Sequence, residues 1–454
     1  MNAAGLASPP GEAAGMETYF HALADAAGRA LAPGERYTLG FAAEDTDFVR
    51  MNRGRVRQPG HVEQRYADVR LIRGARHASH ALSLGGDRAA DMQAIAAAIA
   101  GLRDALAGVP DDPHLLLPSS VDSTRATRDA SMPAPEAMVE QILDLARGHD
   151  LVGILAAGPV FRGFANSDGQ RNWHAATTFN LQWSLYFRGD KAVRCAYSGF
   201  AWRDDALRAR MAKAIDDLAL MSRPPKVLEP GRYRAYLTPS ALQEIVGLLG
   251  WGGFSARAIE TKHSPLMRLR ADARLDPRVS MSEDVAGGVA PAFQEQGFTR
   301  PPTTPLIVDG VLVGALVSPR TAREFDLQTN GANRAEAPES LSMAAGELPA
   351  ADALAALGTG LAVGNLWYLN YSDRPACRMT GMTRFATFWV ENGNVVAPAN
   401  VLRFDDTLYR MLGTNLEALT AERELLLDPD TYGQRTLASA TLPGALLSEM
   451  SFTL

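Results

Sequence analysis

The first half of the chain alternates between helix-like and strand-like spacing of its hydrophobic residues. Apolar side chains three and four positions apart predict amphipathic helices. Between the helices, the stretches 36–84 and 151–202 are rich in alternating, β-branched and aromatic positions, which predicts strands. This order favours an α+β domain with an antiparallel-rich sheet. The predicted helices cover residues 16–32, 87–106, 132–148 and 204–221.

Turn residues mark the connections between the predicted strands. Asn52-Arg53-Gly54 lies between two strand-like runs and predicts a hairpin. A long β-rich run that starts at His174 ends at a second predicted turn, Arg188-Gly189-Asp190. Neighbouring strands joined in this way run antiparallel.

The second half begins after a Pro-rich segment and is dominated by short strands. Residues 222–232 carry Pro, Gly and charged residues and form the best linker candidate in the chain. A strand over 233–237 and a helix from Pro239, with Thr238 as its N-cap, follow. We therefore predict two domains of α+β class, the second of them β-rich. The expected limits are 1–15 for a disordered leader, 16–221 for the first domain, 222–232 for the linker and 233–454 for the second domain.

Composition narrows the class of protein. Of the 454 residues 46% are hydrophobic and 21% charged, which is typical of a globular protein, and the net charge of −6 argues against a nucleic-acid surface. The leader has no Lys or Arg, unlike a signal peptide, and the uncharged run 353–372 is broken by Gly and Asn, so no membrane span is expected. Two cysteines, Cys195 and Cys377, fit a reducing cytoplasm, although their separation alone leaves a disulfide open.

The helix that starts at Pro239 carries a regular apolar stripe. Leu242, Ile245, Val246 and Leu249 stand at i, i+3, i+4 and i+7, which is the pattern of an amphipathic core helix. Taken by itself, the pattern favours that structural interpretation over a binding site.

The same helix resembles the zinc-binding helix of the TldD/PmbA peptidase family, which reads His-Glu-x-x-x-His in the TldD half. Here Gln243 and Leu248 occupy the two His positions, whereas Glu244 and Gly247 are kept. A neutral amide is a weak ligand and an isobutyl group is none, while catalytic zinc needs about three N, S or O donors. Positions i and i+5 also lie about 140° apart on a regular helix, so a shared metal would require a widened turn. The chain is thus similar to the PmbA (TldE) half, which lacks the motif.

Six further segments resemble the family pattern and occur in the family's order. Each alone is weak, because Asn-Gly between apolar runs marks any hairpin. The chain departs from the family pattern at residues 373–378 and 383–387. These departures indicate a divergent member of the family. The resembling segments are 48–57, 164–169, 229–237, 304–316, 329–334 and 388–398.

Other residues that could support chemistry favour ordinary structural roles. His77 and His80 are three apart in a strand and point to opposite faces, and residues 431–454 contain no Cys, His or Asp to serve as a third ligand. Arg374 and Arg378 could lower the pKa of Cys377, but no His follows it as a base, so an inert thiol is favoured. The arginines between Arg50 and Arg76 are expected on solvated strand faces rather than in an anion site.

The resemblance implies a non-catalytic TldE/PmbA-like subunit of a heteromeric zinc metallopeptidase that processes or degrades peptides. It assigns no catalytic, cofactor-binding or metal-binding residue to this chain, with Gln243, Glu244 and Leu248 as degenerate motif positions. Zinc is expected in a TldD-like partner, and the substrate would be a peptide or an unfolded protein, with no nucleic acid and no membrane.

Two alternatives remain open. One is a stand-alone regulatory or binding protein, as a homodimer, in line with the family's older description as a modulator of DNA gyrase. The other is an enzyme with a rebuilt metal-free site, for which no nucleophile–base pair is found. A neighbouring gene with an intact His-Glu-x-x-x-His motif would favour the subunit.

Overall fold

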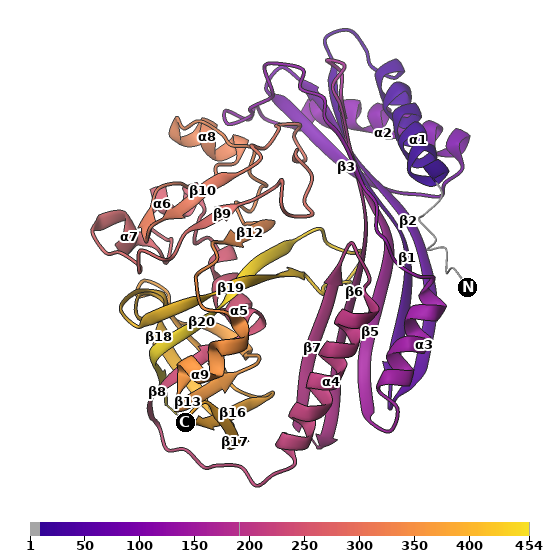
Figure 1. Cartoon of the computed structure of the whole chain (residues 1–454). Helices are drawn as coiled ribbons and strands as arrows, with labels where there is room; N and C mark the ends of the chain where they lie inside the picture. Colours follow the sequence, from indigo (N-terminus) through magenta and orange to yellow (C-terminus); the bar gives the residue numbers. More distant parts are fainter. Residues whose placement is uncertain (1–9, 190, 454) are drawn as a thin grey trace.

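The computed structural model describes residues 10–189 and 191–453, and within them two β-sheets form two domains (Figure 1). The first is a seven-stranded sheet of order β3-β2-β1-β5-β6-β4, with β7 also paired to β6. Neighbours β1, β2, β3, β5, β6 and β7 are antiparallel, as expected from the turn signals, and β4 is parallel to β6. The strands are β1 (Arg36–Asn52), β2 (Arg55–Arg73), β3 (Arg76–Leu84), β4 (Arg125–Arg128), β5 (Asp150–Asn166), β6 (Arg171–Arg188) and β7 (Lys191–Gly199).

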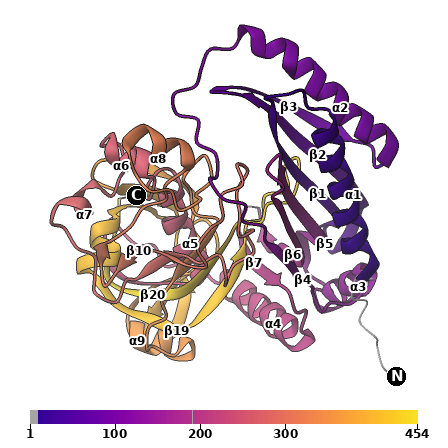
Figure 2. The same cartoon turned by 90° about the horizontal axis from the view of Figure 1, so that it is seen from above.

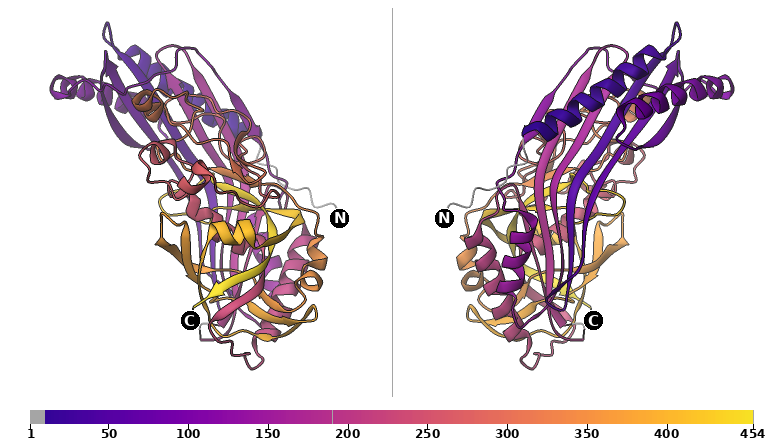
Figure 3. Two further views of the ribbon diagram at one scale, coloured as in Figure 1. Left: turned by 90° about the vertical axis from the view of Figure 1, so that its left-hand side faces the viewer. Right: turned by 90° about the vertical axis from the view of Figure 1, so that its right-hand side faces the viewer.

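Helices cover one face of the first sheet. In Figure 2 the helices α1, α2 and α3 lie on the side of this sheet that faces away from the second domain, and Figure 3 shows α1, in indigo, crossing the long strands diagonally. Phe20 of α1 packs on Phe41 and Trp173 of the sheet. α4 covers β6 and β7 and also reaches β17 of the second domain. The helices are α1 (Pro10–Arg29), α2 (Arg88–Ala105), α3 (Pro135–Leu145) and α4 (Asp204–Met221), with a 3-10 turn η1 (Leu106–Gly108) after α2.

The central strands β5 and β6 are buried on both faces. Their odd-numbered residues, such as Leu155 and Phe179, pack under the helices, while Val160 and Ala176 contact Val289 of the second domain. Double burial explains why these strands show nearly continuous apolar runs instead of strict alternation.

The second sheet has thirteen strands, and the C-terminal strand β20 is its centre. β20 pairs with β8, β12, β18 and β19. The strands are β8 (Gly231–Leu237), β9 (Met281–Glu283), β10 (Thr304–Val308), β11 (Val311–Leu312), β12 (Ser340–Met343), β13 (Gly360–Val363), β14 (Trp367–Asp373), β15 (Arg378–Met382), β16 (Thr387–Glu391), β17 (Asn394–Pro398), β18 (Arg403–Thr407), β19 (Leu416–Leu427) and β20 (Ser439–Phe452).

Short helices and turns surround the second sheet and include several that the sequence pattern did not predict. The domain nevertheless remains β-rich, as expected. These elements are α5 (Pro239–Gly247), η2 (Leu248–Gly250), α6 (Ala256–Glu260), α7 (Met267–Ala271), α8 (Pro319–Phe325), η3 (Ala350–Asp352), α9 (Ala353–Leu357) and η4 (Arg410–Thr414).

The hairpin predictions are confirmed, and several element limits need correction. Arg53 and Gly54 both have positive φ, as a two-residue hairpin turn requires. α1 begins at Pro10, so residues 10–15 are helical although we expected them in a disordered leader, and residues 1–9 lie outside the described residues, as does Asp190 of the predicted turn. The helix expected over 132–148 is shorter, because Pro135 sets its first turn.

The uncharged run 353–372 divides into α9, β13 and the first part of β14, as its Gly residues indicated. Among the helices of the described residues, none has the length and apolar character to cross a membrane. Residues 222–230 lie between α4 of the first domain and β8 of the second sheet. The exact domain limits remain a prediction.

Candidate functional site

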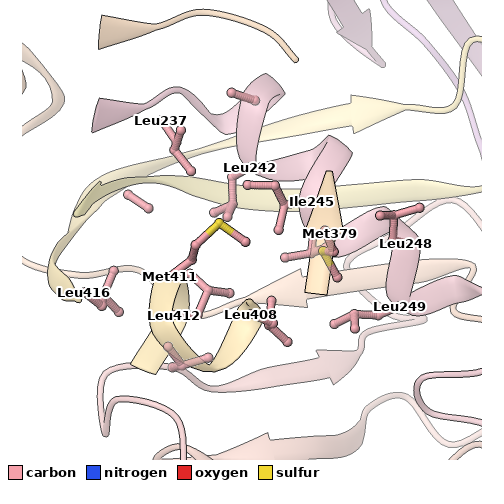
Figure 4. Close-up of a cluster of buried hydrophobic side chains, with 14 of the residues drawn as sticks. Leu237, Leu242, Ile245, Leu248, Leu249, Met379, Leu408, Met411, Leu412 and Leu416 are labelled. Carbon is pink, nitrogen blue, oxygen red and sulfur yellow. The ribbon is translucent and has the colours of Figure 1, made fainter. Parts of the chain in front are cut away.

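Helix α5 carries the degenerate motif and is fixed by its buried face. Thr238 caps it by accepting a hydrogen bond from the Ala241 backbone N at 3.2 Å, and Pro239 occupies the first turn, both as expected. All four residues of the predicted stripe are buried. Figure 4 shows Leu242 and Ile245 facing Met411 and Leu408 in the core of the second domain. The amphipathic-helix prediction is confirmed.

The last turn of α5 is narrower than a metal site would need. A metal ion shared by positions 243 and 248 would require a widened helical turn there. Gly247 has regular helical angles (φ −59°, ψ −32°), and the chain continues into the 3-10 turn η2. Leu248 is 5% exposed and belongs to the core of the second domain, where Figure 4 places it near Met379. The side chain at the second motif position is therefore part of the hydrophobic core.

α5 also lines a cleft of about 450 Å³ between the two domains, mainly with the face opposite the buried stripe. β7 of the first sheet forms one wall, and the adjoining ends of β19 and β20 contribute another. A volume of this size falls within the range of about 300–1,000 Å³ typical of ligand sites. The residues that α5 and η2 contribute are Ser240, Gln243, Glu244, Val246, Gly247, Leu248 and Gly250.

One pair of opposite charges spans the cleft. Nη1 of Arg194, on β7, lies 3.8 Å from Oε1 of Glu244, on α5, which is an ion-pair distance but too long for a hydrogen bond. Burial raises the pKa of Glu244, and the nearby Arg194 opposes that rise. Arg194 also lies over the ring of Phe385 at 5.7 Å.

The second-domain side of the cleft also contains buried polar side chains. With its amide nitrogen facing them, Asn365 donates to the backbone oxygens of Gly364 at 3.2 Å and Arg194 at 3.0 Å, which joins the two domains at the cleft. The hydroxyl of Ser439, at the start of β20, is buried and has no hydrogen-bond partner within the described residues. A buried hydroxyl without a partner is energetically costly.

The loop between β19 and β20 is anchored in the first domain by Arg435. This side chain is 5% exposed, and its Nη2 donates to Oγ1 of Thr178 at 2.5 Å. The Arg435 backbone N donates to Oε2 of Glu44 at 3.2 Å. Burial lowers the pKa of Arg435 to about 10, and Glu44 partly opposes this. Arg435 was not predicted from the sequence, because nothing around it distinguishes it from a solvated loop arginine.

The two cysteines are free, so the disulfide left open by the sequence does not form. Burial raises the pKa of each thiol to about 12. Arg374 acts on Cys377 in the expected direction, but the effect of burial is larger. Since the thiolate is the nucleophilic form, neither residue has the acidity of a catalytic cysteine.

The histidines do not converge on the cleft. His77 pairs with Asp112 at 3.0 Å, and His80, on the same strand β3, is exposed. His174 is buried, which lowers its pKa to about 4. Across residues 10–189 and 191–453, no group of three His, Cys, Asp or Glu side chains is arranged to hold a metal ion.

The arginine-rich strands form local ion pairs. Arg65 pairs with Glu63, Arg73 with Glu35 and Arg76 with Asp111. The arginines of the β1–β2 hairpin are exposed. They are Arg50, Arg53, Arg55 and Arg57. This arrangement agrees with the expected solvated strand faces.

Comparisons with known proteins place this fold. Residues 230–454 match the family model described as the PmbA/TldA metallopeptidase C-terminal domain. TldE from Thermococcus kodakarensis has a similar structure, with a TM-score of 0.76 and 12% identity over 96% of this chain and 100% of that chain. A search among curated proteins gives no match.

Two further solved structures are similar, both described as modulators of DNA gyrase. The protein from Thermotoga maritima has a TM-score of 0.74 and 12% identity, covering 96% of this chain and 100% of that chain. The protein from Bacteroides thetaiotaomicron has a TM-score of 0.74 and 15% identity, covering 96% of this chain and 98% of that chain.

The fold and the cleft beside α5 thus define a two-domain α+β protein built like these relatives. Residues 230–454 belong to the PmbA/TldD family of metallopeptidases, and the whole chain shares the fold of these relatives.

Proposed function

We propose that this chain is a non-catalytic, TldE-like subunit of a heteromeric zinc metallopeptidase in the cytoplasm. A TldD-like partner carries the zinc and its general base, and this chain completes the channel for a peptide or unfolded-protein substrate. The observation that carries the proposal is the state of α5: both motif positions lack a metal ligand, and one of them, Leu248, is part of the core, while the cleft beside the helix stays open. A helix kept as structure beside an open cleft fits a subunit role.

Exposed residues near the cleft are suited to contact a partner chain and a peptide. Trp251, at the cleft, is 55% exposed, and Tyr368 of β14 is 78% exposed. β14 pairs with β15 on one edge and, within the described residues, has no strand on the other. A free edge can bind an extended chain through main-chain hydrogen bonds, which gives affinity with little sequence preference. Exposed aromatic residues are also enriched at protein interfaces.

The test is co-expression with a neighbouring chain that has an intact His-Glu-x-x-x-His motif. We expect the two chains to co-elute in size exclusion and the complex to digest an unstructured peptide, while this chain alone digests none. Separate elution of the two chains would contradict the proposal, as would a partner that cleaves equally well without this chain. A stable homodimer that ignores the partner would favour the stand-alone binding protein instead.

A further inference from the structure

The cleft beside α5 contains a hydrogen-bond donor and a hydrogen-bond acceptor that have no partner within the described residues. Within the described residues, the side chains of Arg194 and Glu244 form no hydrogen bond, and 3.8 Å separates their nearest atoms. A guanidinium offers five N–H donors and a carboxylate only acceptors. Donor and acceptor therefore stand side by side at one place in the cleft.

The charge balance at this place disfavours a charged ligand. A carboxylate drawn to Arg194 would be repelled by Glu244, and an ammonium group drawn to Glu244 would be repelled by Arg194. The third charged residue of the lining, Asp428, uses its Oδ1 to accept from the Asp430 backbone N at 2.9 Å. A neutral group with an acceptor next to a donor matches the Arg194–Glu244 pair best.

A residue in an extended peptide is such a group, because its own C=O and N–H point to the same side of the strand, as in the hydrogen-bonded pairs of antiparallel sheets. Partly or fully exposed apolar side chains line the cleft, among them Leu369 and Trp251, and would accept the residue's side chain. Ser439 adds one further buried hydroxyl that lacks a partner in the described chain.

Gly247 keeps this space open. A Cβ built on it meets no atom within 4 Å, and its φ of −59° suits any residue. Glycine is therefore not required by the backbone, and in a helix it is less stabilising than alanine. A larger side chain here would occupy the cleft at no cost to the helix.

We propose that the cleft binds one uncharged, extended stretch of peptide main chain. Arg194 donates to the carbonyl oxygen of a residue, and Glu244 accepts from the N–H of the same residue. The inference rests on the proposed function for the peptide substrate. It adds that this chain itself binds part of the peptide, and that binding does not depend on the amino or carboxyl end of the peptide.

The test measures binding of a peptide to the isolated full-length chain by calorimetry. The probe is the hexapeptide Leu-Ser-Ala-Leu-Ser-Ala with acetyl and amide blocks, compared with the same peptide carrying a free carboxyl or a free amino end. We expect the blocked peptide to bind, and the unblocked ones to bind within about threefold of it. No binding of the blocked peptide, or a requirement for a free end, would overturn the proposal.

Variants separate binding from folding. Arg194→Met and Glu244→Met should each weaken binding about 10- to 100-fold, the range of a hydrogen bond to a charged group. Gly247→Leu should abolish binding while the melting temperature stays equal or rises. Arg208→Met, on the exposed side of α4, is the matched control and should bind as wild type. Wild-type affinity in Gly247→Leu, with the fold intact, would contradict the proposal.

The outcome is distinguishable from a failure of the proposed function. If the chain binds the blocked peptide but does not assemble with a TldD-like partner, the subunit proposal is wrong and this site stands. If the complex assembles and is active but the isolated chain binds no peptide, the site is wrong and the subunit proposal stands.

Discussion

Arg435 donates from Nη1 to the backbone oxygen of Gly158 at 3.0 Å, and this contact joins a loop of the second domain to the middle of β5. Pairing between β1 and β5 is interrupted there, since Glu44 pairs with Val160 and the next pair is Asp47 with Ala157. Gly158 has φ +145°, and a Cβ on it would lie 2.1 Å from the Asp45 oxygen. The interruption in strand pairing therefore leaves the carbonyl of Gly158 available, and Arg435 donates a hydrogen bond to it.

Replacement of Arg435 with Met should lower the free energy of unfolding by about 3–5 kcal/mol. The backbone oxygens of Gly158 and Thr178 and the Thr178 hydroxyl lose their donor, and the buried Glu44 loses a nearby positive charge, although its hydrogen bond from the backbone N of residue 435 remains. Denaturant titration measures the change. Arg208→Met is the control and should stay within about 0.5 kcal/mol of wild type. A loss below about 1 kcal/mol for Arg435→Met would show that water replaces the side chain.

Stability should fall in acid through Glu35. Hydrogen bonding to Arg103 is the main cause that lowers the pKa of Glu35 from 4.5 to about 2, with Ala32 and Arg73 adding to it and burial opposing it. A depressed carboxyl pKa contributes stability above the unfolded value, and this contribution is lost as pH falls from about 5 to 2. Its size is on the order of 3 kcal/mol.

Comparison with Glu35→Gln checks this assignment. The variant should be less stable at pH 7, and its free energy of unfolding should depend less steeply on pH between 5 and 2. Equal slopes in the variant and the wild type would assign the acid sensitivity to other carboxyl groups, such as Asp112, whose pKa is also lowered by His77 and Arg320 although burial opposes this.

Metal analysis of the purified chain should find well below one zinc per chain after dialysis. The reason is the donor set, since Gln243 and Leu248 supply no strong ligand. About one tightly held zinc per chain would contradict the subunit proposal. A TldD-like partner purified and dialysed in the same way serves as the positive control.

Glu244→Gln should leave kcat of the assembled complex nearly unchanged and raise KM by no more than about threefold. The amide still accepts a hydrogen bond from the peptide but cannot act as a base. Loss of a general base typically costs about 10²–10⁴ in rate. Steady-state kinetics separate the two roles, and a fall in kcat of about 100-fold would make Glu244 catalytic.

Local sequence signals predicted the local parts of the fold. Gly54, Asn392 and Gly393 have the positive φ values that Gly and Asn favour, while Arg53 adopts a positive φ because the two-residue turn requires it. The stripe on α5 is buried, as its spacing required. The five-residue helices α6 and α7 were missed, because such segments are too short to show a period of 3.6.

The cleft depends on contacts between distant segments, so only one of its walls could be predicted. The positions Gln243, Glu244 and Leu248 came from the motif. Arg194 reaches the cleft through the docking of the two domains, and Ser439 through the pairing of β20 with distant strands of the second sheet. Nothing next to these residues in the chain distinguishes them from ordinary strand residues.

The central place of β20 has a consequence for the order in which the protein forms during synthesis. Ala445 of β20 pairs with Leu237 of β8, roughly 200 residues earlier in the chain. The first sheet is built mainly from hairpins of neighbours and can form while the ribosome is still translating. The second sheet must wait for residues 439–452, so its nascent strands need protection from aggregation until translation has passed them.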